Sequence, residues 1–215
     1  CSHPVVVVGP AVLDQEDMED VLSGHSVYRQ TSGIRQKPLT TEQSSSRQRG
    51  LPGSMDDPKG RDGYAYLDRF GYSFDLQIPY WHLEQAAELA ADFPETTLVI
   101  NHTGLPSNRS DLGISAWSDA IEKIALQPNV MIKISGLGRI NQPWAIESNR
   151  GIVLRTLDLF GIDRCMFASN FPVDRLCGDL GTIIQGFHEI VKTLPENKIS
   201  ALFYENAARI YRFNQ

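Results

Sequence analysis

Short apolar runs that alternate with helical patterns along the whole chain constrain its fold most. The runs predict strands at 5–8, 33–36, 73–78, 97–100, 130–134 and 165–168. Between them, apolar residues recur with helical spacing, as at 117, 120, 121 and 124. Successive strands joined by helices are expected to be parallel, because parallel strands need crossover connections. The sequence therefore predicts an α/β protein with a parallel sheet.

Polar residues at the strand ends distinguish between the two common folds of this kind. A doubly wound sheet usually carries a glycine-rich phosphate turn after a strand, and no such motif occurs in this sequence. A TIM barrel builds its site at the carboxyl ends of several strands. Polar side chains stand at or just after the predicted strand ends, namely Arg35, Asp75, Gln77, His102, Ser135 and Asn170. This pattern favours the barrel.

Six sequence strings in order carry a family resemblance. They are GIRQ at 33–36, SFDLQ at 73–77, INHTGLP at 100–106, KISGL at 133–137, FASNFPV at 167–173 and NAARIY at 206–211. With these strings the chain resembles the amidohydrolase-related family, in its lactonase-like branch. The resemblance implies a single TIM-barrel (β/α)8-type metal-dependent hydrolase domain over 1–215, incomplete, with about six of eight β/α units. The first strand here would be the third of the barrel, so an N-terminal part is expected to be missing.

The resemblance also implies a reaction for the intact parent protein, the hydrolysis of a lactone or similar cyclic ester of a small acidic substrate. Water would attack the carbonyl, and the site would polarise its oxygen. His102 and Asn170 would be the catalytic residues, with His102 stabilising the developing oxyanion. Arg35 would orient the acidic substrate, and Asp75, Gln77 and Ser135 would complete the substrate-binding set.

Two departures from the family pattern keep other functions open. The family usually carries an HxH pair on its first strand, and the sequence contains none. Family members commonly have Asp where this chain has Asn170, and an amide cannot ionise. Asp174 could replace the missing carboxylate, although a helix N-cap is the more ordinary role for it. The alternatives are an inactive truncated or binding protein on a degenerate barrel and a metal-dependent decarboxylase.

A metal is not expected in this chain, although some family members use a divalent ion such as zinc. The remaining histidines show no paired metal spacing, and structural or solvent-exposed roles are expected for all of them, namely His3, His25, His82 and His188.

The tract at 37–62 is rich in Ser, Gln, Gly, Pro and charge and has almost no apolar periodicity. It predicts a long loop, either a lid over the site or a disordered surface insertion, and the most mobile internal segment.

The composition limits the kinds of partner that are expected for this protein. The net charge of −6 comes without a basic run, which excludes the usual footprint of a nucleic-acid binder. No apolar stretch approaches the roughly 20 residues that a membrane span needs. Three cysteines without CxxC spacing indicate a reducing cytoplasm. The expected partners are a small-molecule substrate and, through the open edges of an incomplete barrel, further copies of the chain.

Overall fold

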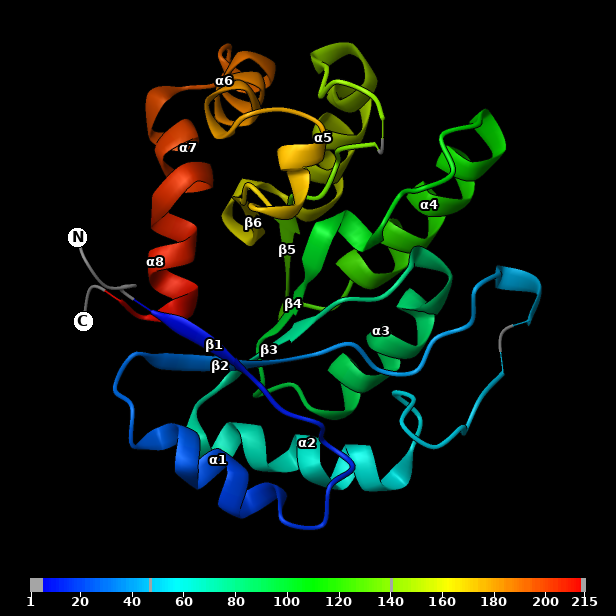
Figure 1. Cartoon of the computed structure of the whole chain (residues 1–215), viewed down its shortest axis with the longest axis vertical. Helices are drawn as coiled ribbons and strands as arrows, with labels where there is room; N and C mark the ends of the chain where they lie inside the picture. Colours follow the sequence, from blue (N-terminus) through cyan, green and yellow to red (C-terminus); the bar gives the residue numbers. More distant parts are fainter. Residues whose placement is uncertain (1–5, 47, 140, 214–215) are drawn as a thin grey trace.

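The fold is a single parallel sheet with helices packed on its outer face. The computed structural model describes residues 6–46, 48–139 and 141–213. The six strands lie in sequence order, and every neighbouring pair is parallel. They are β1 (Val7–Pro10), β2 (Thr31–Gln36), β3 (Ser73–Leu76), β4 (Leu98–Ile100), β5 (Val130–Ile134) and β6 (Cys165–Phe167). The sheet order confirms the predicted α/β architecture, in which each strand pairs with the next along the chain (Figure 1).

Helices connect the strands as the sequence pattern predicts. The long ones are α1 (Met18–Ser26), α2 (Pro58–Phe70), α3 (Leu83–Asp92), α4 (Asp111–Ala125), α5 (Ile146–Phe160) and α6 (Leu180–Val191). The chain ends with α7 (Glu196–Ser200), a π-helical turn η6 (Ala201–Glu205) and α8 (Asn206–Tyr211). Short 3-10 turns are η1 (Ser44–Ser46), η2 (Tyr80–His82), η3 (Asn101–Gly104), η4 (Ile162–Arg164) and η5 (Val173–Leu176).

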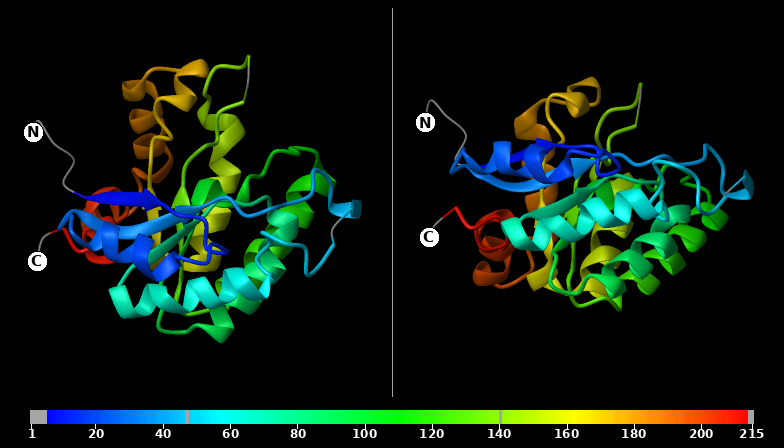
Figure 2. Two further views of the ribbon diagram at one scale, coloured as in Figure 1. Left: turned by 60° about the horizontal axis from the view of Figure 1, so that its bottom comes forward. Right: turned by 90° about the horizontal axis from the view of Figure 1, so that it is seen from below.

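The two faces of the sheet pack against different partners. Outward-pointing strand residues such as Phe74, Ile100 and Ile132 join the helices in one large core. On the opposite, concave face, Val99 and Met166 pack with Tyr211 of α8 in a second, smaller cluster. Alternation along the strands explains this division, because successive side chains point to opposite faces. Figure 2 shows that α8 lies close to the start of β1.

The sheet is open, as expected for an incomplete barrel. Among the described residues, β1 pairs only with β2 and β6 pairs only with β5. The described helices include none that is long and apolar enough to cross a membrane.

Several element boundaries differ from the sequence prediction. Residues 58–62, expected in the loop, form the first turns of α2, because the Asp57 side chain caps that helix by accepting from the Lys59 N–H at 3.1 Å. Helix α4 begins at Asp111, ahead of the apolar stripe that starts at 117, because the Ser110 side chain caps it by accepting from the Gly113 N–H. The strand predicted over 73–78 ends at Leu76.

Candidate functional site

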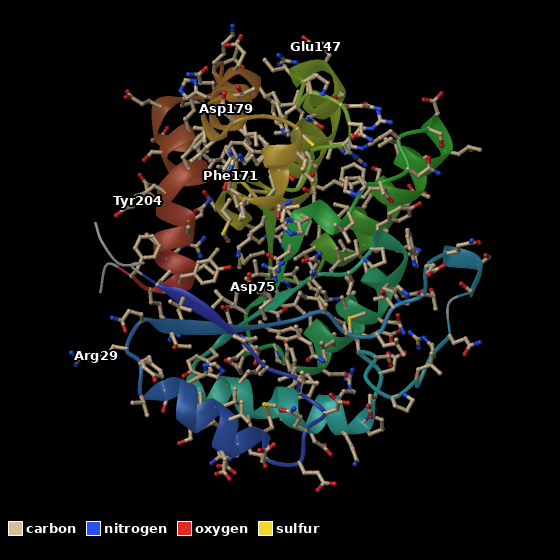
Figure 3. All side chains as sticks on the ribbon, in the orientation of Figure 1. Arg29, Asp75, Glu147, Phe171, Asp179 and Tyr204 are labelled. Carbon is tan, nitrogen blue, oxygen red and sulfur yellow. The ribbon has the colours of Figure 1, made fainter. Side chains whose placement is uncertain are left out.

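The polar residues singled out in the sequence lie at the carboxyl end of the parallel sheet. Strand pairing sets Arg35 beside Asp75 in neighbouring strands. His102 follows β4, Ser135 follows β5, and Asn170 lies on the loop after β6. In Figure 3, Asp75 lies at the level of the strands, and Phe171 marks the loop after β6. Parallel strands bring these separate segments to the same edge of the sheet.

His102 stands in an unusual turn. Its φ is 55° and that of Thr103 is 56°, a left-handed conformation that costs energy in residues with a side chain. The turn is held from outside, because the indole N–H of Trp117 donates to the Thr103 carbonyl at 2.7 Å. Two buried polar atoms of the same turn, Asn101 Nδ2 and Thr103 Oγ1, have no hydrogen-bond partner among the described residues. Backbone strain of this kind is typical of functional sites.

The surroundings of His102 keep its ring neutral. Burial, followed by the positive charges of Arg35, Lys133 and Lys37, lowers the pKa of His102 to about 4. Its Nδ1 lies 2.9 Å from Oγ of Ser135, within hydrogen-bond distance. If the Ser135 hydroxyl donates to Nδ1, the other ring nitrogen carries the proton and can donate it in a hydrogen bond. The histidine is therefore neutral and lies within the electrostatic influence of three positively charged side chains.

Asp75 is deeply buried and fully engaged. Its side chain is 1% exposed and accepts from Lys133 Nζ at 2.5 Å. Its other oxygen accepts from the Tyr211 hydroxyl at 2.8 Å. Lys133 Nζ also lies 4.9 Å from the centre of the Tyr211 ring. Burial, followed by the Asp75 charge, raises the pKa of Tyr211 well above its ordinary value. In this arrangement Asp75 holds Lys133 and Tyr211 in place at the site.

Arg35 and Gln77 form a second pair at the same edge. The Arg35 guanidinium donates to Oε1 of Gln77, and both side chains are half-buried. Among the described residues no hydrogen bond joins Arg35 to Asp75 of the neighbouring strand, because Lys133 and Tyr211 donate to the two carboxylate oxygens. Arg35 therefore keeps its positive charge without an ion-pair partner among the described acidic side chains.

Asn170 and Asp174 form a third pair. Asn170, which has a left-handed φ of 54°, donates from Nδ2 to Oδ1 of Asp174 at 2.8 Å. Burial raises the pKa of Asp174, while hydrogen bonds from Asn170 and the Gly138 backbone act in the opposite direction. Asp174 is buried in η5 and is not a helix cap, since Asp179 caps α6 through the Thr182 N–H at 2.7 Å. The N-cap interpretation of Asp174 is therefore wrong.

The loop after β5 lies between these pairs. A Cβ added at Gly136, whose φ is +61°, would lie 2.8 Å from Cγ of His102. One added at Gly138 would lie 3.2 Å from Cγ of Asp174. The glycines allow the close approach of this backbone, which places His102 and Asp174 on the two sides of one short segment.

The described residues do not fit a divalent metal ion. No group of three or more His, Cys, Asp or Glu side chains among them is arranged to hold one. The donors themselves explain this, because Asp75 is occupied by Lys133 and Tyr211 and Asn170 carries no charge. Cations beside His102 would also repel a second positive charge.

Lys133 and Tyr211 are the two site residues that sequence reasoning missed. Lys133 had a signal, since it alternates with the buried Ile132 and Ile134 and must point to the concave face. Tyr211 had none, because its contact with Asp75 joins residues that are 136 positions apart.

Comparison with known proteins identifies a matching family and several similar proteins. Residues 1–213 match the protein family described as Amidohydrolase. The uncharacterized protein y4mH of Sinorhizobium fredii is 39% identical over 215 residues, covering 98% of this chain and 71% of that protein. The L-fucono-1,5-lactonase of Burkholderia multivorans is 28% identical over 172 residues. That alignment covers 73% of this chain and 57% of the lactonase, so the chain spans only part of this relative.

A solved structure shares the fold. An amidohydrolase from Burkholderia multivorans, crystallised with bound zinc, superposes with a TM-score of 0.81 at 24% identity. The superposition covers 97% of this chain and 73% of that protein. It supports the incomplete TIM barrel read from the strand order.

Proposed function

Because the chain belongs to the amidohydrolase family, we propose that it forms the carboxyl-end site of a hydrolase that opens a lactone of a small acidic sugar or related acid. The observation that carries the proposal is the neutral His102 surrounded by Arg35, Lys37 and Lys133. Such a cluster attracts an anionic substrate and stabilises negative charge that develops on a carbonyl oxygen. The lactonases among the relatives support the choice of a cyclic ester.

Each pair in the site has a role in this reaction. The Arg35 guanidinium binds the substrate carboxylate, and Gln77 keeps it in position. His102, held by Ser135, donates a hydrogen bond to the carbonyl oxygen as water attacks, and Lys133 adds positive charge nearby. Asn170 can accept a hydrogen bond from water or substrate through its oxygen, because its amide nitrogen is committed to Asp174. The bond between the carbonyl carbon and the ring oxygen then breaks, and the proton that the attacking water loses ends on the ring oxygen, so that one water is added to give the open hydroxy acid.

A non-catalytic binding role is the second candidate. It is favoured by Asn170, which cannot take a proton from water at neutral pH. A decarboxylase that depends on a metal gains no support, since the described donor side chains do not fit a metal ion.

Free thiols at Cys165 and Cys177 support a proposed location in the cytoplasm. Association of copies through β1 and β6 stays a prediction.

Replacing Arg35 by Met tests the substrate class. We expect kcat/KM for lactones that carry a carboxylate to fall by about 100-fold, because a charge-assisted contact to the substrate is lost. Neutral lactones of the same ring size serve as the internal control and should change by less than about threefold. The measurement is the initial rate of acid release from a panel of charged and neutral lactones of the same ring size. Equal losses on both classes would contradict the assignment of Arg35 to a carboxylate.

A further inference from the structure

The last helix of the chain contributes a residue to the candidate site. Tyr211, at the end of α8, packs with Val99 of β4 and Met166 of β6 on the concave face of the sheet. It is 6% exposed. The polar residues Asp75 and Lys133 lie on the same face and contact this ring or its hydroxyl. The end of the chain therefore supplies a buried aromatic ring to the face that carries the site.

Hydrogen bonds at both ends hold α8 in place. At its start, Asn206 donates from Nδ2 to the carbonyls of Ile162 at 2.7 Å and Cys165 at 2.8 Å. At its end, the Arg212 guanidinium donates to the carbonyl of Gly71, ahead of β3. These contacts join the helix to the start of β6 and to the turn before β3. The position of Tyr211 relative to the strands is therefore fixed.

Tyr211 acts on Lys133 in two ways. Its hydroxyl donates to Oδ1 of Asp75 at 2.8 Å, while Lys133 Nζ donates to the other oxygen of the same carboxylate. The hydroxyl therefore fixes the carboxylate that binds the ammonium group. The Tyr211 ring also lies under the ammonium group, with its centre 4.9 Å from Nζ, a distance at which the face of an aromatic ring attracts a cation.

The ammonium group of Lys133 needs such support to stay in one place. A lysine side chain is long and flexible, and it carries a point charge without the rigid geometry of a guanidinium. The Lys133 side chain is 18% exposed, so water is within its reach. Its charge is one of the three that act on His102. The electrostatic field at His102 therefore depends on where the ammonium group lies.

From these contacts we propose that Tyr211 is a positioning residue, which fixes the Lys133 ammonium group near His102 through its ring and through Asp75. The C-terminal helix is then part of the candidate site. Apolar packing alone would not require the hydroxyl, because a phenylalanine would fill the same cluster. The effect on hydrolysis rests on the proposed function, whereas the restraint on Lys133 can be measured without a substrate.

The reactivity of the Lys133 amino group tests the restraint. Reductive methylation with formaldehyde and cyanoborohydride modifies amino groups, and mass spectrometry of the peptides gives the rate at each lysine. Tyr211→Phe keeps the ring and removes the hydroxyl, so the rate at Lys133 should rise by about fivefold. Tyr211→Leu removes both contacts and should raise it by about 20-fold. The exposed Lys192 is the internal reference and should change by less than about 1.5-fold.

Lactone hydrolysis tests the consequence for the site. In Tyr211→Phe we expect kcat to fall by about tenfold and KM to change by less than about twofold. The reason is that the positive charge acts on an oxygen that becomes negative in the transition state. Tyr204→Phe, a matched change at an exposed tyrosine of the adjoining turn η6, should keep both wild-type values.

The two measurements separate this proposal from the proposed function. Methylation of Lys133 at the wild-type rate in folded Tyr211→Phe, or an equal rise at Lys192, would overturn the proposal. Faster methylation with an unchanged kcat would also overturn it, because the restraint would then have no effect on the reaction. Absence of lactone turnover in the wild type would contradict the proposed function, and the methylation rates would still decide whether Tyr211 restrains Lys133.

Discussion

Replacing Lys133 by Met is expected to lower the free energy of unfolding by about 3–5 kcal/mol at neutral pH. The reason is the burial of its partner, since the Asp75 side chain is 1% exposed and lies 2.5 Å from Lys133 Nζ. Without the ammonium group, Tyr211 is the remaining hydrogen-bond donor to a buried carboxylate. An uncompensated buried charge costs far more than the lost ion pair contributed.

The pH dependence of this variant follows from the same cause. The lone buried carboxylate will bind a proton more readily in the folded than in the unfolded chain, so its folded pKa is raised. A raised folded pKa gives stability that is present at low pH and lost as the pH rises. The deficit of Lys133→Met relative to wild type should therefore be smaller at about pH 5 than at about pH 8.

Urea denaturation of four proteins provides the measurement. The double variant Asp75→Asn with Lys133→Met removes both charges and should recover most of the loss, to within about 1.5 kcal/mol of wild type. Lys192→Met breaks an exposed pair with Glu189 and should cost less than about 1 kcal/mol. A loss for Lys133→Met no larger than that of Lys192→Met would show that the buried pair does not form.

Replacing Asn170 by Asp, the residue common in the family, is expected to destabilise this chain as the pH rises. Nδ2 of Asn170 now donates to Asp174 at 2.8 Å, and the change would set two carboxylates face to face. Since burial already raises the pKa of Asp174, the pair should share one proton near neutral pH. The folded pair then binds more protons than the unfolded chain does, so stability is lost with rising pH.

Between about pH 5 and about pH 8 we expect a loss of about 2–4 kcal/mol relative to wild type. The matched control is the exchange Asn170→Asp with Asp174→Asn, which keeps one carboxylate and one amide and should lie within about 1 kcal/mol of wild type. Chemical denaturation at several pH values measures the free energy of unfolding of both variants and so distinguishes the single variant from the exchange. A pH profile of Asn170→Asp parallel to that of the wild type would mean that the two side chains are not in contact.

Much of the fold follows from the sequence, because strand runs and helical stripes are local signals. The runs at 130–134 and 97–100 mark β5 and β4 closely, and the polar residues that follow them lie at one edge of the sheet. Helix boundaries that depend on capping were harder to predict. The start of α2 depends on Asp57 and that of α4 on Ser110, which had to be chosen among several polar residues.

The site was only partly accessible to sequence reasoning, since its residues act in pairs formed by the fold. His102 and Ser135 were both expected, and the structure joins them. Asp75 was expected in the substrate-binding set, and the structure adds hydrogen bonds to it from Tyr211 and Lys133 that sequence reasoning did not predict. The polar composition of 37–62 suggested mobility, and it gave no sign that Thr41 binds a buried histidine. Mobility of that tract stays a prediction.

The most direct test of the proposed function is lactone turnover in wild type and in His102→Asn. The asparagine can keep a hydrogen bond with Ser135 but lacks the far ring nitrogen that would donate to the carbonyl oxygen. On the lactone that the wild type opens fastest, kcat/KM should fall by at least about 100-fold. The exposed His188→Asn should keep the wild-type rate. Wild-type turnover that His102→Asn retains to within about twofold, or no turnover of any lactone that binds, would contradict the account.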